Sequence, residues 1–167
     1  TLKTGASPNS ITYFQRLNGT DQPDYSVSFD TAGAVSGASD FDFDPTTGFM
    51  NWVKSHPASQ VTSTADAVTG KMAYGFVSNP KEDTITYFSR IGTKDQPSYS
   101  LKYGLVDNDT NNDGIIEDSE KASLRRVTER SAFTFVGEEM KEVATYGVED
   151  LNSDGTLKTG ASPNSIT

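Results

Sequence analysis

The sequence predicts a mainly β, antiparallel fold with minor helix, and three observations carry that prediction. Nine Phe, seven Tyr and one Trp supply the bulky side chains that sheets favour. Apolar and polar residues alternate in several short runs, which is the period of a half-buried strand. Two similar segments also carry the pattern of a β-hairpin. With 167 residues, the chain is long enough for one large domain or two small ones.

The two hairpin segments indicate an internal repeat. Residues 11–27 (ITYFQRLNGTDQPDYSV) and 85–101 (ITYFSRIGTKDQPSYSL) start 74 residues apart and agree at ten of seventeen positions. Each has a β-branched and aromatic run, a polar turn and an alternating run. Pro23 and Pro97 are expected where the turn gives way to the second strand, since that position needs no amide donor. The chain therefore reads as two diverged half-repeats, about residues 9–82 and 83–155.

The remaining elements follow from shorter patterns. Residues 71–78 (KMAYGFVS) and 132–136 (AFTFV) predict further strands. Residues 47–56 and 138–146 predict short helices, the second with Met140, Val143 and Ala144 on one face. The stretch 57–70 is rich in Ser, Thr and Ala and predicts a loop.

An acidic run alternates with phenylalanine at residues 40–44 (DFDFD). In a strand, successive side chains point to opposite faces, so the phenylalanines would face inward and the carboxylates would face water. The alternative is a further metal site at Asp40, Asp42 and Asp44, although Pro45 rules out a loop of the EF-hand type there.

Residues 1–12 and 156–167 are identical (TLKTGASPNSIT). An identity of this length indicates a tandem array with a period of 155 residues, in which 1–155 form one repeat unit and 156–167 start the next. A terminal segment duplicated on purpose would give the same identity. Arrays of one rigid unit build length, which favours a stalk, fibre or adhesin over an enzyme. The expected partners are neighbouring copies of the repeat, joined end to end or in a filament. Residues 164–167 could pair with, or displace, the first hairpin strand of the next molecule.

The sharpest chemical motif is residues 109–120 (DTNNDGIIEDSE), which resembles the twelve-residue calcium loop of the EF-hand family. Gly114 stands at position 6 and Ile116 at position 8 of that loop. The candidate calcium (Ca²⁺) ligands are Asp109, Asn111, Asp113, Ile115 through its carbonyl, Glu117, and Glu120 as the bidentate ligand. Calcium takes six to eight hard oxygen ligands, and alternate side chains of a wrapping loop can supply them. The preceding run predicts a strand, so the resemblance is to strand-loop variants of the motif. The alternative is an ordinary solvated hairpin turn.

A second loop spans the start of the duplicated segment. Asp150, Asn152 and Asp154 fall at positions 1, 3 and 5, which resembles the opening half of a dockerin-type calcium loop. The pattern then departs from that family, because Lys158 and Ala161 stand at positions 9 and 12. An ion here would need a ligand from elsewhere, and it would stiffen the connection between repeats.

A looser resemblance covers about seventy residues. The runs 84–88, 100–103, 123–127 and 143–151 are similar, in order, to the C-terminal heads of minor type IV pilins and type II secretion pseudopilins. Several members of that family bind calcium. This resemblance implies an alternative function as the head of an extracellular pilus or secretion appendage.

Composition excludes several classes of function. The formal charge of −9 disfavours nucleic acid and anionic membranes and favours divalent cations. No apolar run reaches the roughly 18 residues of a membrane span, so direct membrane insertion is not expected. There is no cysteine, and the single histidine, His56, lies in a Lys-Ser-His-Pro segment that predicts a surface turn rather than a general base.

These observations predict a non-enzymatic, calcium-stabilised repeat of an extracellular or cell-surface filament or adhesin. Glycan binding through aromatic residues such as Trp52, Tyr13 or Tyr87 is a further alternative, which the exposure of those side chains would test.

Overall fold

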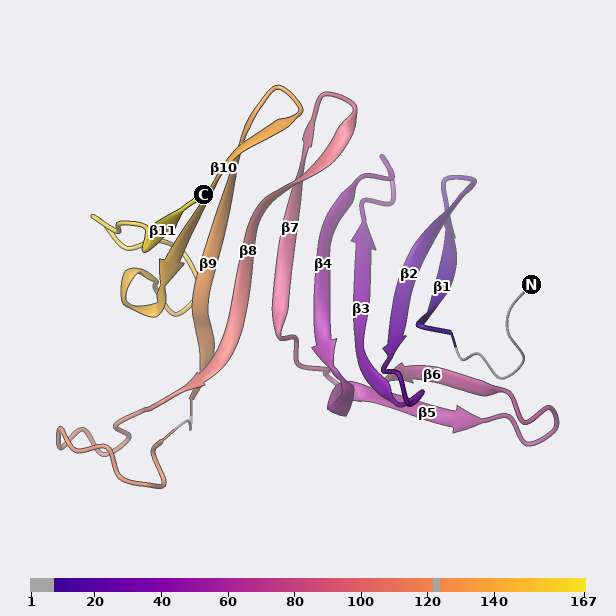
Figure 1. Ribbon diagram of the computed structural model, residues 1–167, viewed down its shortest axis with the longest axis horizontal. Helices are drawn as coiled ribbons and strands as arrows, with labels where there is room; N and C mark the ends of the chain where they lie inside the picture. The colour runs from indigo at the N-terminus through magenta and orange to yellow at the C-terminus, as the bar shows by residue number, and fades with distance from the viewer. Residues whose placement is uncertain (1–7, 122–123) are drawn as a thin grey trace. The chain divides into compact units, whose positions relative to one another are not determined.

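The computed structural model describes residues 8–121 and 124–167, which form a mainly β structure of antiparallel strands (Figure 1). This confirms the predicted fold class. The chain divides into two compact units, Thr1–Asp83 and Thr84–Thr167. Residues 1–7, most of the first copy of the duplicated segment, lie outside the described residues.

The first unit is a sheet in the order β1-β2-β3-β4, with a separate two-stranded sheet of β5 and β6. Its strands are β1 (Ser10–Leu17), β2 (Thr20–Phe29), β3 (Val35–Phe43), β4 (Met50–Pro57), β5 (Val61–Ala65) and β6 (Met72–Phe76). The predicted strand at residues 71–78 is therefore β6. Residues 40–43 of the DFDFD run form the end of β3, and Phe43 is buried, as the strand interpretation predicts.

The second unit is a sheet in the order β7-β8-β9-β10-β11. Its strands are β7 (Thr84–Ile91), β8 (Lys94–Val106), β9 (Leu124–Val136), β10 (Glu139–Gly147) and β11 (Ser165–Ile166). The predicted strand at residues 132–136 is the end of the longer β9. The last strand, β11, belongs to the second copy of the duplicated segment.

The two predicted hairpins are β1–β2 and β7–β8, and they share their details. Each pairs two tyrosines across the strands, Tyr13 with Tyr25 and Tyr87 with Tyr99, and the ring centroids are 4.4 and 4.7 Å apart. The register shifts immediately after the first tyrosine in both hairpins. The sequence identity between the segments therefore encodes one hairpin geometry.

Both hairpin prolines lie inside the second strand rather than at its start. Pro23 pairs with Phe14 and Pro97 with Phe88, on the far side of the register shift. A bulge tolerates a residue that has no amide donor, because the ladder is already interrupted there.

The two predicted helices are wrong. Residues 47–56 mostly belong to β4 and residues 138–146 to β10, and each strand pairs with the strand before it. A helix of nine or ten residues is marginal by itself, whereas a strand gains a full ladder of hydrogen bonds from its neighbour. Helical structure in the described residues consists of two 3₁₀ turns, Ala58–Gln60 and Val148–Asp150. The predicted loop at 57–70 is also only partly right, since it contains β5.

Each unit buries a small core under a short covering segment. In the first unit, Val27 and Ala38 are buried in the sheet, and β6 packs across it. The Tyr25 hydroxyl donates to the Tyr74 carbonyl at 2.7 Å, and the Phe29 and Tyr74 rings meet edge to face. In the second unit the core consists of Leu101, Val127 and Leu151, surrounded by tyrosines.

Candidate calcium-binding loops

The loop from Asp109 to Glu120 lies between β8 and β9 (Figure 1). Its first half is organised by its own acidic side chains. Asp109 Oδ2 accepts a hydrogen bond from the Gly114 amide at 2.8 Å, and Asp113 Oδ1 accepts one from the Ile115 amide at 2.8 Å. Asn111 Oδ1 accepts from the Asp113 amide at 3.1 Å. Side chains at positions 1, 3 and 5 thus turn toward the loop backbone.

The backbone of this half-loop needs residues that adopt positive φ. Asn112 has φ of 59° and Gly114 has φ of 82°. Gly and Asn are the residue types that take this conformation at least cost, so the sequence Asn-Asp-Gly is suited to the tight wrapping of the chain.

Glu120 closes the loop from its other end. Its side chain is buried, with 3% of the residue exposed, and Oε1 accepts hydrogen bonds from the Thr110 amide at 2.8 Å and from the Thr110 hydroxyl. Oε2 accepts from the Glu117 amide at 3.2 Å. The bond from the Thr110 hydroxyl, supported by those from loop amides, lowers the pKa of Glu120. The ionised carboxylate of Glu120, at position 12 of the loop, therefore bonds both Thr110 at position 2 and Glu117 at position 9.

The donor set fits a hard cation, because the candidate ligands are all oxygen. Within residues 8–121 and 124–167, however, no three His, Asp or Glu side chains gather as a metal-binding group. The carboxylates of Asp109, Asp113 and Glu120 accept hydrogen bonds from the loop instead. Calcium would have to draw also on the Asn111 amide oxygen and the Ile115 carbonyl. Glu117 is exposed at the loop surface.

The second candidate loop forms the turn of a very short hairpin in which Leu151 pairs with Leu157. Asp154 Oδ1 accepts from the Thr156 amide at 2.9 Å and from its hydroxyl at 2.7 Å, which stabilises the turn. Asp150 accepts from the Ser162 amide at 3.4 Å, and the Asn152 side chain donates to the Thr156 hydroxyl. Asn152 and Asp154 lie in this turn, whereas Asp150 is the last residue of the 3₁₀ turn Val148–Asp150 that precedes it, and calcium there stays a prediction.

Sequence reasoning missed the packing role of this hairpin. Leu151 is 1% exposed, and Gly155 lies against Leu101 and Val127 of the sheet. Arg130 donates to the Gly155 carbonyl at 3.0 Å. In the sequence, Leu151 and Leu157 flank the turn residues Asn-Ser-Asp-Gly. Apolar residues on both sides of such a turn indicate a hairpin.

The third acidic cluster contributes to turn formation and to cross-strand contacts. Asp44 begins the β3–β4 turn, and its Oδ1 accepts hydrogen bonds from the amides of Thr46 and Thr47 at 2.8 and 2.7 Å. Asp42 accepts from the Asn51 side chain at 2.8 Å on the paired strand. Asp40 lies opposite Lys54, and burial raises its pKa.

The surface position predicted for His56 is wrong. The residue is 3% exposed, its Nδ1 lies 3.2 Å from the Lys81 carbonyl, and its ring packs on Phe76 with centroids 4.9 Å apart. Strand pairing of β4 with β3 brings this side chain under β6, a placement that the local sequence does not reveal.

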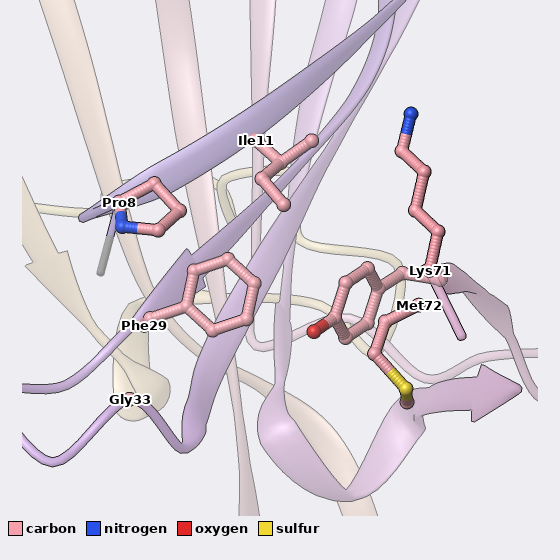
Figure 2. Close-up of a pocket in the computed structure, with 7 residues that line it drawn as sticks. Pro8, Ile11, Phe29, Gly33, Lys71 and Met72 are labelled. Atoms are coloured by element: carbon pink, nitrogen blue, oxygen red, sulfur yellow. The ribbon is translucent and has the colours of Figure 1, made fainter. Parts of the chain in front are cut away.

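The aromatic residues considered for glycan binding are half-buried. Tyr13 and Tyr87 stack on their hairpin partners, and the Lys54 ammonium lies 4.3 Å from the Trp52 ring centroid. Tyr13 also borders a pocket of about 260 Å³ that includes Asp66, Thr69 and Lys71. A neighbouring pocket of about 250 Å³ contains Pro8, Ile11 and Phe29 (Figure 2).

Comparison of the chain with protein-family models, curated proteins and solved structures finds no match. In the part of the chain that the structure describes, no helix is long and apolar enough to cross a membrane.

Proposed function

We propose that this chain is a non-enzymatic structural repeat of an extracellular, cell-surface filament or adhesin stalk, stabilised by calcium. The observation that carries the proposal is the identity of residues 1–12 and 156–167. The described parts of both copies enter a sheet: the first copy leads into β1, and the second forms β11. A duplicated segment that contributes a strand at both places suits a module built to continue into another of its kind.

The role proposed for calcium is to stabilise the folded repeat at residues 109–120. An ion that binds only the folded state adds RT ln(1 + [Ca²⁺]/Kd) to the free energy of unfolding, about 2.7 kcal/mol at a hundredfold excess over Kd. Weak sites of extracellular modules have Kd values of roughly 0.1 to 1 mM, so millimolar calcium would be needed. Residues Asp109, Asn111, Asp113 and Glu120 would hold the ion, and the connection between β8 and β9 would become more rigid.

Thermal unfolding in EDTA and in millimolar calcium tests this proposal. We expect about 1 mM calcium to raise the melting temperature of the native chain by a few degrees, because it adds about 0.4 to 1.4 kcal/mol when Kd is roughly 0.1 to 1 mM, and 1 kcal/mol shifts a domain of this size by about 2 to 4 °C. Asp109→Ala should abolish the rise, because it removes the first ligand of the loop. Asp118→Ala is the matched control, since Asp118 lies in the same loop and its exposed carboxylate pairs with Lys121 at 2.7 Å. Equal calcium responses of the two variants would contradict a site at Asp109.

A glycan-binding module is the second candidate function, and the pocket beside Tyr13 favours it. An aromatic ring next to a carboxylate, a hydroxyl and an ammonium group offers both a stacking surface and polar contacts for a sugar. Saturable glycan binding that Tyr13→Ala removes, with no calcium effect on stability, would favour this class. The pilin-like head stays an alternative, and it would require a single head domain in the parent protein instead of an array.

A further inference from the structure

We propose that residues 164–167 are a shared strand, which pairs with β10 of its own repeat and with β2 of the repeat that follows. In a continuing array, residues 164–167 of one repeat are residues 9–12 of the next, because the two segments are identical (NSIT). The inference rests on the proposed function, since it takes the duplication to mark a repeat boundary.

The second copy of the segment shows the first half of this arrangement. Ser165 and Ile166 of β11 pair with Thr145 and Ala144 of β10. The Thr167 amide donates to the Val143 carbonyl at 3.1 Å, and the Val143 amide donates back to Thr167 at 2.9 Å. Thr167 therefore directs both of its backbone groups toward β10.

The first copy shows the other half. β1 pairs with β2 in a continuous register from Ser10 to Tyr13, and the Phe29 amide donates to the Asn9 carbonyl at 2.9 Å. Hydrogen-bonded pairs alternate along an antiparallel ladder, so Ile11 forms the next such pair, with Val27. Thr12, like Ser10, then directs its backbone groups away from β2.

The two pairings use opposite edges of the same four residues. Thr12 and Thr167 are the same position of the segment, and the edge that Thr12 leaves open is the edge that Thr167 bonds to β10. The first of the four residues, Asn9 in the first copy and Asn164 in the second, also bonds the two neighbouring strands through different atoms. Its carbonyl accepts from Phe29 in the first copy, and its amide donates to the Thr145 carbonyl at 2.7 Å in the second. No backbone group is needed twice.

The first unit repeats one of these contacts internally. Asp83 stands 74 residues after Asn9, at the same place before the second hairpin. Its amide donates to the Ser55 carbonyl of β4 at 2.7 Å, as Asn164 donates to Thr145 of β10. Docking of this leading residue on the last long strand before it is thus a feature of both half-repeats.

Side-chain burial points the same way. Ile166 is 60% exposed in β11, whereas Ile11 is half-buried and lines a pocket with Phe29, as Figure 2 shows. In a shared strand, Ile166 would lie beside Phe29 of the next repeat. An exposed edge strand otherwise invites unspecific pairing, and a shared strand removes that edge.

Amide hydrogen exchange tests the shared strand. The 167-residue chain is compared with a two-repeat chain in which residues 13–167 follow Thr167. The Ile166 amide faces away from β10 and should exchange at least roughly tenfold more slowly in the two-repeat chain, because it gains a partner on β2 of the next repeat. Thr167 should be protected in both chains. Unchanged exchange of Ile166 would overturn the proposal.

A matched pair of proline variants in the two-repeat chain keeps the test sharp. Thr167→Pro removes the donor to Val143 and should speed exchange at Val143, whereas Thr12→Pro in the first repeat removes a donor at an open edge and should leave the ladder protected. Equal effects would overturn the proposal.

A protected Ile166 without a calcium effect on melting would refute only the calcium part of the proposed function. A calcium effect with an unprotected Ile166 would refute only the shared strand.

Discussion

Individual carboxylates organise the turns of this protein. Asp44 and Asp66 each accept hydrogen bonds from a threonine amide and hydroxyl three residues later, in the segments DPTTG and DAVTG. In both, the glycine that follows the threonine has positive φ, 73° at Gly48 and 67° at Gly70. Aspartate thus offers the amides of the turn a local acceptor. Much of the acidic composition contributes to local structure, and the loop at 109–120 combines this with a calcium-type spacing over all twelve positions.

Glu120 should make the stability of the chain depend on pH. Because the folded state lowers its pKa, the stabilising contribution is complete above the ordinary value of 4.5 and is lost as the pH falls below it through the folded pKa. In EDTA, Glu120→Gln should unfold more easily at neutral pH and lose less stability than the native chain as the pH falls below 4.5. Urea unfolding at several pH values measures this.

The control is Asp118→Asn, which removes an exposed carboxylate from the same loop. Its stability should follow the native pH dependence. If Glu120→Gln also ran parallel to the native chain across the acid range, the hydrogen bonds to Glu120 would not contribute to stability.

Single elements of the two units correspond beyond the hairpins that the sequence revealed. β4 and β10 are each followed by a 3₁₀ turn and then by a hairpin, β5–β6 in the first unit and the Leu151–Leu157 pair in the second. The closing bonds match, since Val77 donates to the Gln60 carbonyl and Lys158 to the Asp150 carbonyl. The second covering hairpin is shorter, and the predicted junction loop is its turn.

Packing of that hairpin should be sensitive to a single methyl group. A Cβ added at Gly155 would lie 2.9 Å from Leu101 Cδ2, whereas one at Gly160 would meet nothing within 4 Å. Both glycines have φ of 82°, so the backbone strain of an alanine is matched. Gly155→Ala should therefore destabilise the chain by about 1 to 3 kcal/mol more than Gly160→Ala, the usual effect of overpacking a core. Urea midpoints of the two variants measure the difference, and equal midpoints would contradict this packing.

At this level the sequence predicted the elements that have strong local signals. Residues 11–27 and 85–101 form the expected hairpins because turn residues and alternation are both present. The helix predicted over residues 138–146 is wrong because Met140, Val143 and Ala144 share a face only at helical spacing, whereas in β10 the adjacent Val143 and Ala144 point to opposite faces of the sheet. The choice depends on the open edge of β9, which lies outside the local window.

The molecule as a whole combines a large net negative charge with a small buried core. A formal charge of −9 produces self-repulsion that opposes compaction. Raising NaCl from about 0.01 to 0.15 M shortens the Debye length from roughly 30 to 8 Å. We therefore expect the melting temperature in EDTA to rise with salt, equally in the native chain and in Asp109→Ala. A salt response that the variant lacked would mean that sodium acts at the loop itself, and calcium titrations should accordingly be run at constant ionic strength.

The sequence by itself determined the β class, the repeated hairpin, the duplicated segment and the oxygen-rich spacing of residues 109–120. These features follow from the order of residues along the chain, and they can be recognised without knowing which residues are neighbours in space. Only the tertiary structure decided that residues 47–56 and 138–146 are strands, that His56 is buried, and that residues 164–167 dock on β10. Each of these depends on which strand edge or sheet face is free to receive a segment. That is a long-range property, because the backbone groups and apolar surface it satisfies belong to residues far away in the chain.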